Sequence, residues 1–293
     1  MKKPYLFAGI SILFWSTLAT VSKLLLGSLS SYQVLLYSAL FAALTLLLVN
    51  LITGKIKLLC RYRPRDYLIM LLIGLPGTFF YYVFLYLGTA RMEASQAFII
   101  NYLWPIMSVL FAALLLKERL TPRKLVAFAL SFLGVLTVAG GQLLQFNETL
   151  LIGTVLCVLA AVSYGLFTAL TQKWQYDEQV SMMLSFFAAF LLSIITNAWL
   201  GQSTAPGGLQ WLGFAYNGIF IMALATVTWA LALKTGGTAK ISNLAYITPF
   251  LSLVWTFFVL HEPIAPLSLV GLAVIVLGLF IQLGGKEKPA QIE

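Results

Sequence analysis

Long apolar runs separated by short polar segments make up the whole chain. Ten of these runs carry almost no charge and show no regular alternation of apolar and polar positions. A helix that crosses a bilayer needs about 20 apolar residues, whereas the strands of a membrane barrel are shorter and alternate. The pattern therefore predicts an all-α membrane protein with ten transmembrane helices, at residues 5–27, 32–53, 66–89, 94–116, 122–141, 149–172, 180–200, 209–233, 238–260 and 265–284.

A polar and aromatic cluster interrupts the fourth of these runs. It reads Asn101-Tyr102-Leu103-Trp104-Pro105. Proline inside a helix removes one backbone hydrogen bond and clashes with the carbonyl four residues earlier. In lipid such a break is tolerated only where it faces protein or a water-filled cavity. The cluster therefore predicts a cavity, to which Asn101, Tyr102 and Trp104 offer hydrogen-bonding groups and ring faces.

The second half of the chain repeats the first at an offset of 144 residues. Pro249 follows Pro105 by that distance (249 − 105 = 144). Further matches in the same register are Tyr102 with Tyr246, Ser108 with Ser252, Glu118 with Glu262, Pro122 with Pro266, and Gly134 with Gly278. So many matches in one register predict two copies of one unit, which we place at residues 1–141 and 142–293.

The number of helices in each copy sets the orientation of the second copy. Five helices is an odd number, so the second copy begins on the opposite side of the membrane. Inverted repeats of this kind place a substrate site near the middle of the membrane, between halves that exchange access, and use helices with broken geometry. Pro105 and Pro249 supply such breaks. The predicted architecture is therefore two inverted five-helix repeats around a central cavity.

Composition and charge exclude a soluble domain and orient the chain. The 293 residues are 61% hydrophobic and 9% charged, with a mean hydropathy of +0.96. The formal net charge of +9 gathers in loops on one side: if the N-terminus is cytoplasmic, only Arg91 falls in an outer loop. The positive-inside rule therefore predicts a multi-pass protein of the plasma (inner) membrane with both termini in the cytoplasm. Because this asymmetry accounts for the charge, we expect no nucleic-acid partner.

Several of these features resemble a known family. The fourth and ninth helices are centred on proline and each run into Leu-x-Glu, at residues 116–118 and 260–262, and Trp15-Ser16-Thr17 lies in the first helix. These features resemble the EamA family of the drug/metabolite transporter superfamily. Residues 101–105 and 246–249 are most similar to its aromatic amino acid exporters of the YddG type. The resemblance implies a ten-helix bundle that moves amino acids or related small metabolites outward, and we expect a monomer in the lipid bilayer with no cofactor.

The resemblance also implies which residues line the cavity. Aromatic positions of helices one, three, four, six and eight line it in those exporters, and the matching residues here are Trp15, Phe79, Tyr102, Trp104, Tyr164 and Trp229. The third helix departs from the pattern, because Phe79 stands where a polar aromatic residue is expected and Tyr81 and Tyr82 are shifted along. The candidate substrate-binding set is completed by Ser16, Tyr82, Asn101 and Tyr246.

Each candidate has a structural alternative. Trp15 could pack against a neighbouring helix, and Asn101 could satisfy backbone groups freed by the proline. Tyr102 and Trp104 lie about 200° apart around a helix, so both face one cavity only if the kink rotates the segment after it. Tyr246 could join two helices through a hydrogen bond.

Charged groups are sparse inside the predicted helices. All nine acids and the only histidine, His261, lie at helix ends or in loops, and we expect structural roles for Glu118 and Glu262. Lys23 could attract a carboxylate in an outer vestibule or extend its ammonium group to the lipid headgroups. Because a deep carboxylate is missing, we expect a neutral, aromatic cavity.

The sequence therefore predicts a secondary transporter that works by alternating access. We expect it to export amino acids, with aromatic or large apolar ones favoured. A multidrug or cation exporter of the same fold is the alternative. An intramembrane enzyme is not predicted, because no catalytic pair, nucleotide-binding loop or metal-binding set is evident.

Overall fold

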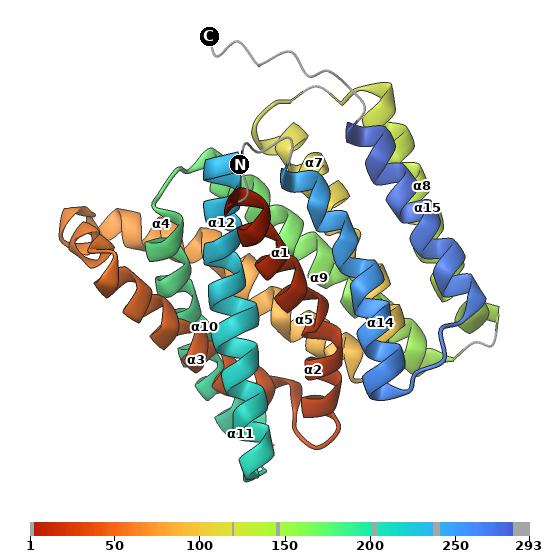
Figure 1. The fold of residues 1–293 in the computed structure, drawn as a ribbon, viewed down its shortest axis with the longest axis horizontal. Helices are drawn as coiled ribbons and strands as arrows, with labels where there is room; N and C mark the ends of the chain where they lie inside the picture. Colours follow the sequence, from red (N-terminus) through yellow and green to blue (C-terminus); the bar gives the residue numbers. More distant parts are fainter. Residues whose placement is uncertain (1–2, 119, 145–146, 201–203, 237–240, 284–293) are drawn as a thin grey trace.

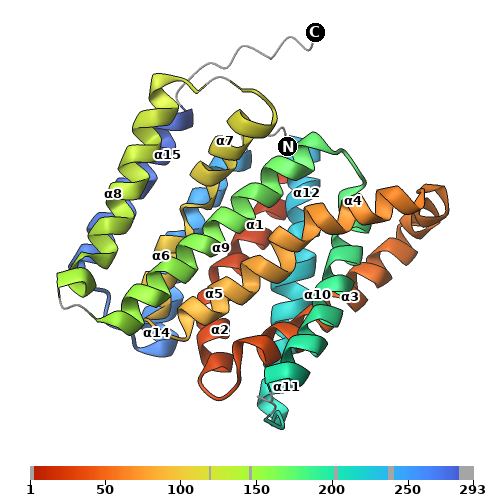
Figure 2. The ribbon, with the colours of Figure 1, turned by 180° about the vertical axis from the view of Figure 1, so that it is seen from behind.

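The computed structural model describes residues 3–118, 120–144, 147–200, 204–236 and 241–283. These residues form a bundle of helices (Figure 1; Figure 2). In chain order the helices are α1 (Lys3–Ser16), α2 (Leu18–Leu26), α3 (Ser31–Ile52), η1 (Lys55–Arg61), α4 (Pro64–Leu75), η2 (Pro76–Phe80), α5 (Tyr81–Thr89), α6 (Ala94–Asn101), α7 (Trp104–Leu115), α8 (Pro122–Leu144), α9 (Glu148–Lys173), α10 (Glu178–Leu200), α11 (Gly208–Ala215), η3 (Tyr216–Leu224), α12 (Ala225–Gly236), η4 (Ser242–Ile247), α14 (Thr248–Leu260) and α15 (Pro266–Leu283).

Seven helical runs within the described residues are long and apolar enough to cross a membrane. They are Lys3–Leu26, Ser31–Ile52, Pro64–Thr89, Ala94–Leu115, Glu148–Lys173, Glu178–Trp199 and Gly208–Gly236. Two shorter apolar helices follow, Leu244–Leu260 and Pro266–Ile281. Large apolar side chains such as Leu72, Ile195 and Phe258 are exposed on the outside of the bundle, as lipid-facing residues are. The predicted class of all-helical, multi-pass membrane protein is confirmed.

Helices that are far apart in the sequence lie side by side. α8 packs along α15, and α3 packs along α10 (Figure 1; Figure 2). Nearer the middle, α1 packs against α12 and α14, while α9 packs against α5 and α7. α1 begins and α15 ends at the same end of the bundle (Figure 1). The two halves of the chain are therefore interleaved around a shared core.

Close approach of α9 and α7 depends on Gly165. A Cβ atom at Gly165 would lie 2.5 Å from Met107 Cβ and 2.7 Å from the Ser108 backbone nitrogen. Within a membrane, where water does not drive helices together, such small residues allow the backbones to approach and pack. Since one of the two clashing atoms belongs to the backbone, a side-chain rotation alone would not make room.

We expect Gly165→Ala to lower the melting temperature of the purified protein in detergent. The added methyl group overpacks the α7–α9 contact, which costs roughly 1–3 kcal/mol. Gly9→Ala is the matched control, because a Cβ at Gly9 meets nothing within 4 Å and alanine favours a helix. Equal melting temperatures for the two variants would contradict the close approach of α7 and α9.

Candidate functional site

The predicted break in the fourth membrane span is present. α6 ends at Asn101 and α7 begins at Trp104, so the helix is interrupted for two residues. Pro105 lies in the first turn of α7, where a helix does not need the missing N–H. Because the axis breaks here, Tyr102 and Trp104 both line one cavity, which an unbroken helix would not allow.

The cavity lies in the middle of the bundle and has a volume of about 490 Å³. That volume is within the range of small-molecule sites. Rings on its wall contact each other in pairs that join different helices. The ring centroids of Trp15 and Trp229 are 5.3 Å apart, and those of Trp104 and Tyr164 are 5.1 Å apart in an edge-to-face arrangement. Such contacts hold the rings in place without a charged group.

One end of the cavity opens to the surface. Gln172, Trp174 and Gln175 line the cavity and are exposed. They lie at the end of α9, which is the end of the bundle where α1 begins (Figure 2). The cavity is therefore accessible from that end.

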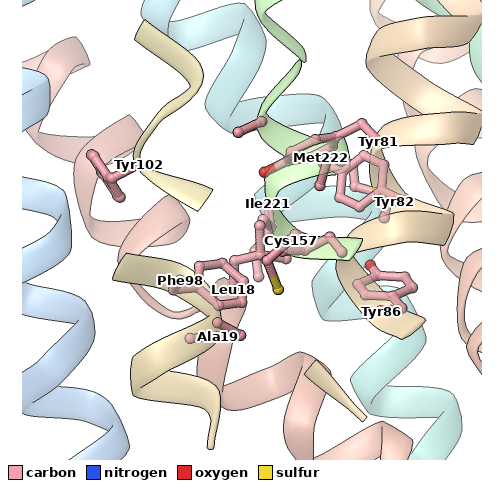
Figure 3. Packing of buried hydrophobic residues seen from close by; sticks show 14 of the residues in the cluster. Leu18, Ala19, Tyr81, Tyr82, Tyr86, Phe98, Tyr102, Cys157, Ile221 and Met222 are labelled. Carbon is pink, nitrogen blue, oxygen red and sulfur yellow. The ribbon is translucent and has the colours of Figure 1, made fainter. Parts of the chain in front are cut away.

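The other end of the cavity is closed by packed apolar side chains. Leu18, Phe98 and Met222 line the cavity and also belong to the buried cluster that contains Ala19 and Cys157 (Figure 3). All five side chains are buried. A ligand that enters from the open end therefore cannot pass through to the opposite side in this conformation.

Glu262 joins the segment after α14 to the start of α6. One carboxylate oxygen accepts a hydrogen bond from the Ala94 backbone nitrogen at 2.9 Å, and the other accepts one from the Ser95 nitrogen at 3.0 Å. These two residues begin α6, so the carboxylate binds two of the backbone N–H groups that every helix start leaves free. The Glu262 side chain therefore caps a helix from the other half of the chain.

Lys23 makes a second polar contact near this closed end. Its ammonium group donates to the carbonyl oxygens of Thr89, at 3.0 Å, and Met92. The contact places a cation at the C-terminal end of α5, where a helix dipole favours positive charge. Lys23 therefore binds backbone within the protein, which differs from both sequence-based alternatives. Burial raises the pKa of nearby Glu93, and Glu262 raises it further, while Lys23 acts in the opposite direction.

Two polar side chains on the cavity wall have unsatisfied atoms. Asn101 donates through Nδ2 to the Tyr81 hydroxyl at 3.0 Å. Asn101 Oδ1 and Ser252 Oγ are both buried, and neither has a hydrogen-bond partner among the described residues. A buried polar atom without a partner is costly, so a bound molecule that reaches either atom after a shift of the surrounding side chains relieves that cost. The Asn101 side chain bonds to Tyr81 and not to backbone freed by the proline, which favours its role as a cavity residue.

The structure brings seven of the ten candidate residues to the cavity wall: Trp15, Tyr82, Asn101, Tyr102, Trp104, Tyr164 and Trp229. Ser16 is elsewhere, because its hydroxyl accepts a hydrogen bond from Trp255 Nε1 at 3.0 Å. Phe79 is buried in the core within the π-helical turn η2, and Tyr246 packs against Phe280 with centroids 5.8 Å apart. A π turn holds more residues than an α turn, so the positions around it change the direction in which they point.

Many wall residues were not among the candidates from the sequence, and three of them matter for the chemistry of the cavity. Tyr81 and Ser252 line the cavity, as does Glu178, the first residue of α10. The repeat contains a signal for Ser252, because it pairs with Ser108 and follows Pro249 by one helical turn. Glu178 is at a helix end, as expected, but the cavity reaches that end. The expectation of a neutral cavity is therefore wrong.

A membrane-embedded helical bundle with a broken helix and a one-sided aromatic cavity has the architecture of a small-molecule transporter. The sequence model of the EamA-like transporter family matches residues 2–140 and again residues 151–284. The chain belongs to this family. The predicted family is thereby confirmed, and its members are transporters.

Named relatives and a solved structure are consistent with this assignment. An uncharacterised transporter of Clostridium kluyveri is 25% identical over 98% of this chain and 95% of its own. The aromatic amino acid exporter YddG of Ancylobacter novellus is 25% identical over 61% of this chain and 63% of its own. A protein of Streptantibioticus cattleyicolor, named a probable terminal-alkyne amino-acid exporter, is 28% identical over 75% of this chain and 74% of its own. A crystal structure with 22% identity shares the fold over 96% of both chains, with a TM-score of 0.70.

Proposed function

We propose that the protein is a secondary transporter that exports amino acids, aromatic or large apolar ones first, or related small metabolites, by alternating access. The observation that carries this proposal is the cavity of about 490 Å³, which has aromatic walls and two buried polar atoms without partners. Ring faces suit an apolar side chain, while Asn101 Oδ1 and Ser252 Oγ suit a polar head group. The names of two relatives, an aromatic amino acid exporter and a probable terminal-alkyne amino-acid exporter, support the substrate class.

We further propose the inverted repeat, with boundaries at residues 1–141 and 142–293. The family model matches twice, once in each half. The packing supports a twofold relation, because α8–α15 and α3–α10 join equivalent helices of the two copies. The contacts of α1 with α12 and α14 correspond to those of α9 with α5 and α7. The third and eighth spans each contain a π-helical segment, η2 and η3.

Transport by the purified protein in liposomes tests the proposal. Liposomes loaded with labelled phenylalanine or tryptophan should release the label faster than protein-free liposomes do, and unlabelled amino acid outside should accelerate the release. A multidrug or cation exporter is the second candidate, favoured by the carboxylate of Glu178 on the wall. Export of cationic dyes together with no movement of any amino acid would favour that candidate and contradict the first.

We place both termini and the open end of the cavity in the cytoplasm, and the native cysteines allow a test. Cys60 is exposed and follows α3, whereas Cys157 is buried. In intact cells a membrane-impermeant maleimide should leave Cys60 unlabelled, because the positive-inside rule places it in the cytoplasm. Gly208→Cys, combined with Cys60→Ser, should be labelled from outside. An added Cβ at Gly208 meets nothing within 4 Å, so the cysteine is accommodated. Labelling of Cys60 in intact cells would overturn this orientation.

A further inference from the structure

We infer that Glu178 is the counter-charge for an ammonium group of the substrate, so the cavity selects molecules that join a positively charged amine to an apolar or aromatic body. This inference rests on the proposed transport function and names the charge of its substrate. Three features of the structure support it. Glu178 lies on the cavity wall, the adjacent Asp177 already binds the helix start and Lys55, and the rest of the described wall is aromatic and uncharged.

Glu178 lies at the mouth of the cavity. It lines the main cavity, and it also lines a small adjoining hollow together with Met182 and Thr226. Among the described residues of the main cavity wall, Glu178 is the sole Asp, Glu, Lys, Arg or His. This carboxylate is therefore the group on the described wall that attracts a cation through its charge.

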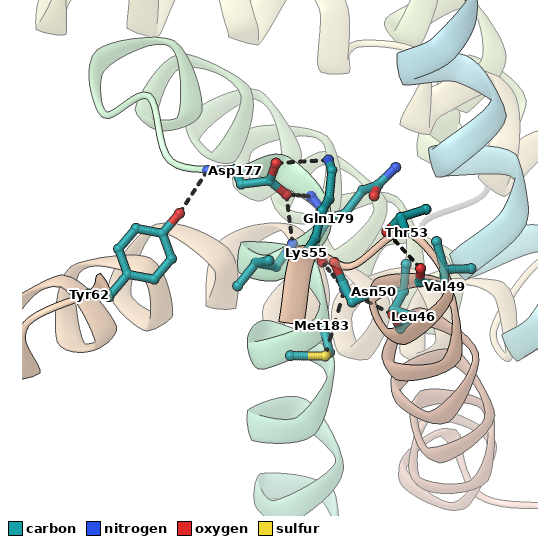
Figure 4. A network of polar contacts seen from close by, with 10 residues as sticks. Leu46, Val49, Asn50, Thr53, Lys55, Tyr62, Asp177, Gln179 and Met183 are labelled. Carbon is teal, nitrogen blue, oxygen red and sulfur yellow. Dashed lines mark hydrogen bonds and ion pairs between the residues drawn. The ribbon is translucent and has the colours of Figure 1, made fainter. Parts of the chain in front are cut away.

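The usual structural role of an acid at a helix start is already filled by Asp177. One oxygen of Asp177 accepts hydrogen bonds from the backbone nitrogens of Gln179, at 3.1 Å, and Val180, at 3.2 Å. Its other oxygen pairs with the Lys55 ammonium group at 2.8 Å (Figure 4). The charge of Lys55 also acts on Glu178, but the carboxylate that Lys55 pairs with is that of Asp177. Within the described part of the chain, the carboxylate of Glu178 makes no hydrogen bond or ion pair.

The rings deeper in the cavity suit the body of such a substrate. Thr226, which shares the hollow with Glu178, precedes Trp229 by one turn of α12, and Trp229 contacts Trp15. Tyr164 lies on the wall of the same cavity as Glu178. An ammonium group held at the carboxylate is therefore near aromatic faces, which attract cations as well. The described wall offers a substrate carboxylate neutral hydrogen-bond donors and no cation. The cavity therefore does not require the substrate to have a carboxylate.

Three ligands of similar shape but different charge test which charged group of a substrate the cavity binds. Phenylalanine amide carries the amine alone, phenylalanine carries amine and carboxylate, and 3-phenylpropionate carries the carboxylate alone. Binding to the purified full chain is measured by calorimetry. We expect the wild type to bind the amide most tightly and 3-phenylpropionate most weakly. In Glu178→Gln the affinity for the amide should fall about tenfold, and that for 3-phenylpropionate should stay equal or rise.

Salt provides an independent measurement. Glu178 is exposed at the mouth, so added ions screen its charge. Raising sodium chloride from about 0.05 M to about 0.5 M should weaken amide binding to the wild type severalfold, and should change binding to Glu178→Gln much less.

Glu148→Gln is the matched control. Glu148 is the first residue of α9, just as Glu178 is the first residue of α10. It follows the capping residue Asn147, whose side chain accepts a hydrogen bond from the Leu150 nitrogen at 3.2 Å. Glu148 is exposed and does not line the cavity. Its variant should bind all three ligands as the wild type does.

The outcomes separate this inference from the proposed function. If wild type and a folded Glu178→Gln bind the amide and phenylalanine equally well, the inference is wrong while amino acid transport stands. If 3-phenylpropionate binds the wild type more tightly than the amide does, the inference is also wrong. If the wild type binds none of the three and transports no aromatic amino acid, both proposals fall.

Discussion

Trp104→Ala should abolish most transport while the protein still folds and inserts into the membrane. The Trp104 ring lies on the cavity wall directly after the helix break, and it packs edge to face against Tyr164. Removing a ring that contacts the substrate loses roughly 1–3 kcal/mol of apolar and aromatic contact. That loss corresponds to a fall in affinity of roughly five- to more than a hundredfold. Trp15→Ala should act in the same way, because Trp15 lines the cavity against Trp229.

Trp199→Ala is the control for these two variants. Trp199 belongs to α10, does not line the cavity, and has 87% of its surface exposed. Transport is measured per folded molecule, as efflux of labelled phenylalanine divided by the amount of monodisperse protein. Trp199→Ala should transport as the wild type does. Wild-type transport by both cavity variants at normal abundance would show that the cavity is not the transport site.

Seven of the ten predicted spans and the break could be predicted because each has a local physical cause. The apolar length needed to cross a bilayer can be counted along the chain, and Pro105 interrupts a helix whatever surrounds it. The break also explains how Tyr102 and Trp104 share one cavity. The sequence alone left that question open, because a regular helix sets them on opposite sides.

The direction of other side chains could not be predicted, because it depends on local distortions and on partners distant in the sequence. The π turn η2 changes the phase of the third span, so Tyr81 and Tyr82 line the cavity and Phe79 does not. Ser16 is adjacent to Trp15, but its hydroxyl is engaged by Trp255, 239 positions later in the chain. Glu178 was predicted at a helix end, and only the three-dimensional packing shows that the cavity extends to it.

Glu262 shows the same limit, since its position was predicted and its partner was not. The repeat pairs it with Glu118 at the ends of two equivalent helices. Their surroundings differ: Glu262 caps α6, whereas Glu118 forms an ion pair with Lys124 at 3.2 Å on the exposed surface. Two glutamates in the same register are therefore in different environments, and only one of them fastens the closed end of the cavity.

Glu262→Gln should destabilise the start of α6. Hydrogen–deuterium exchange of the backbone amides of residues 94–101 measures this loss of stability. A carboxylate accepts from both the Ala94 and Ser95 nitrogens, whereas an amide side chain has one acceptor oxygen and presents N–H groups to the other donor. Losing one charge-assisted hydrogen bond and the favourable charge at a helix start costs about 2–3 kcal/mol. We therefore expect exchange at these amides to accelerate by roughly 30- to 150-fold.

Glu118→Gln is the control and should leave the exchange of these amides unchanged, because the Glu118 carboxylate contacts Lys124 and not α6. Wild-type protection of Ala94 and Ser95 in Glu262→Gln would show that the carboxylate does not fasten the closed end.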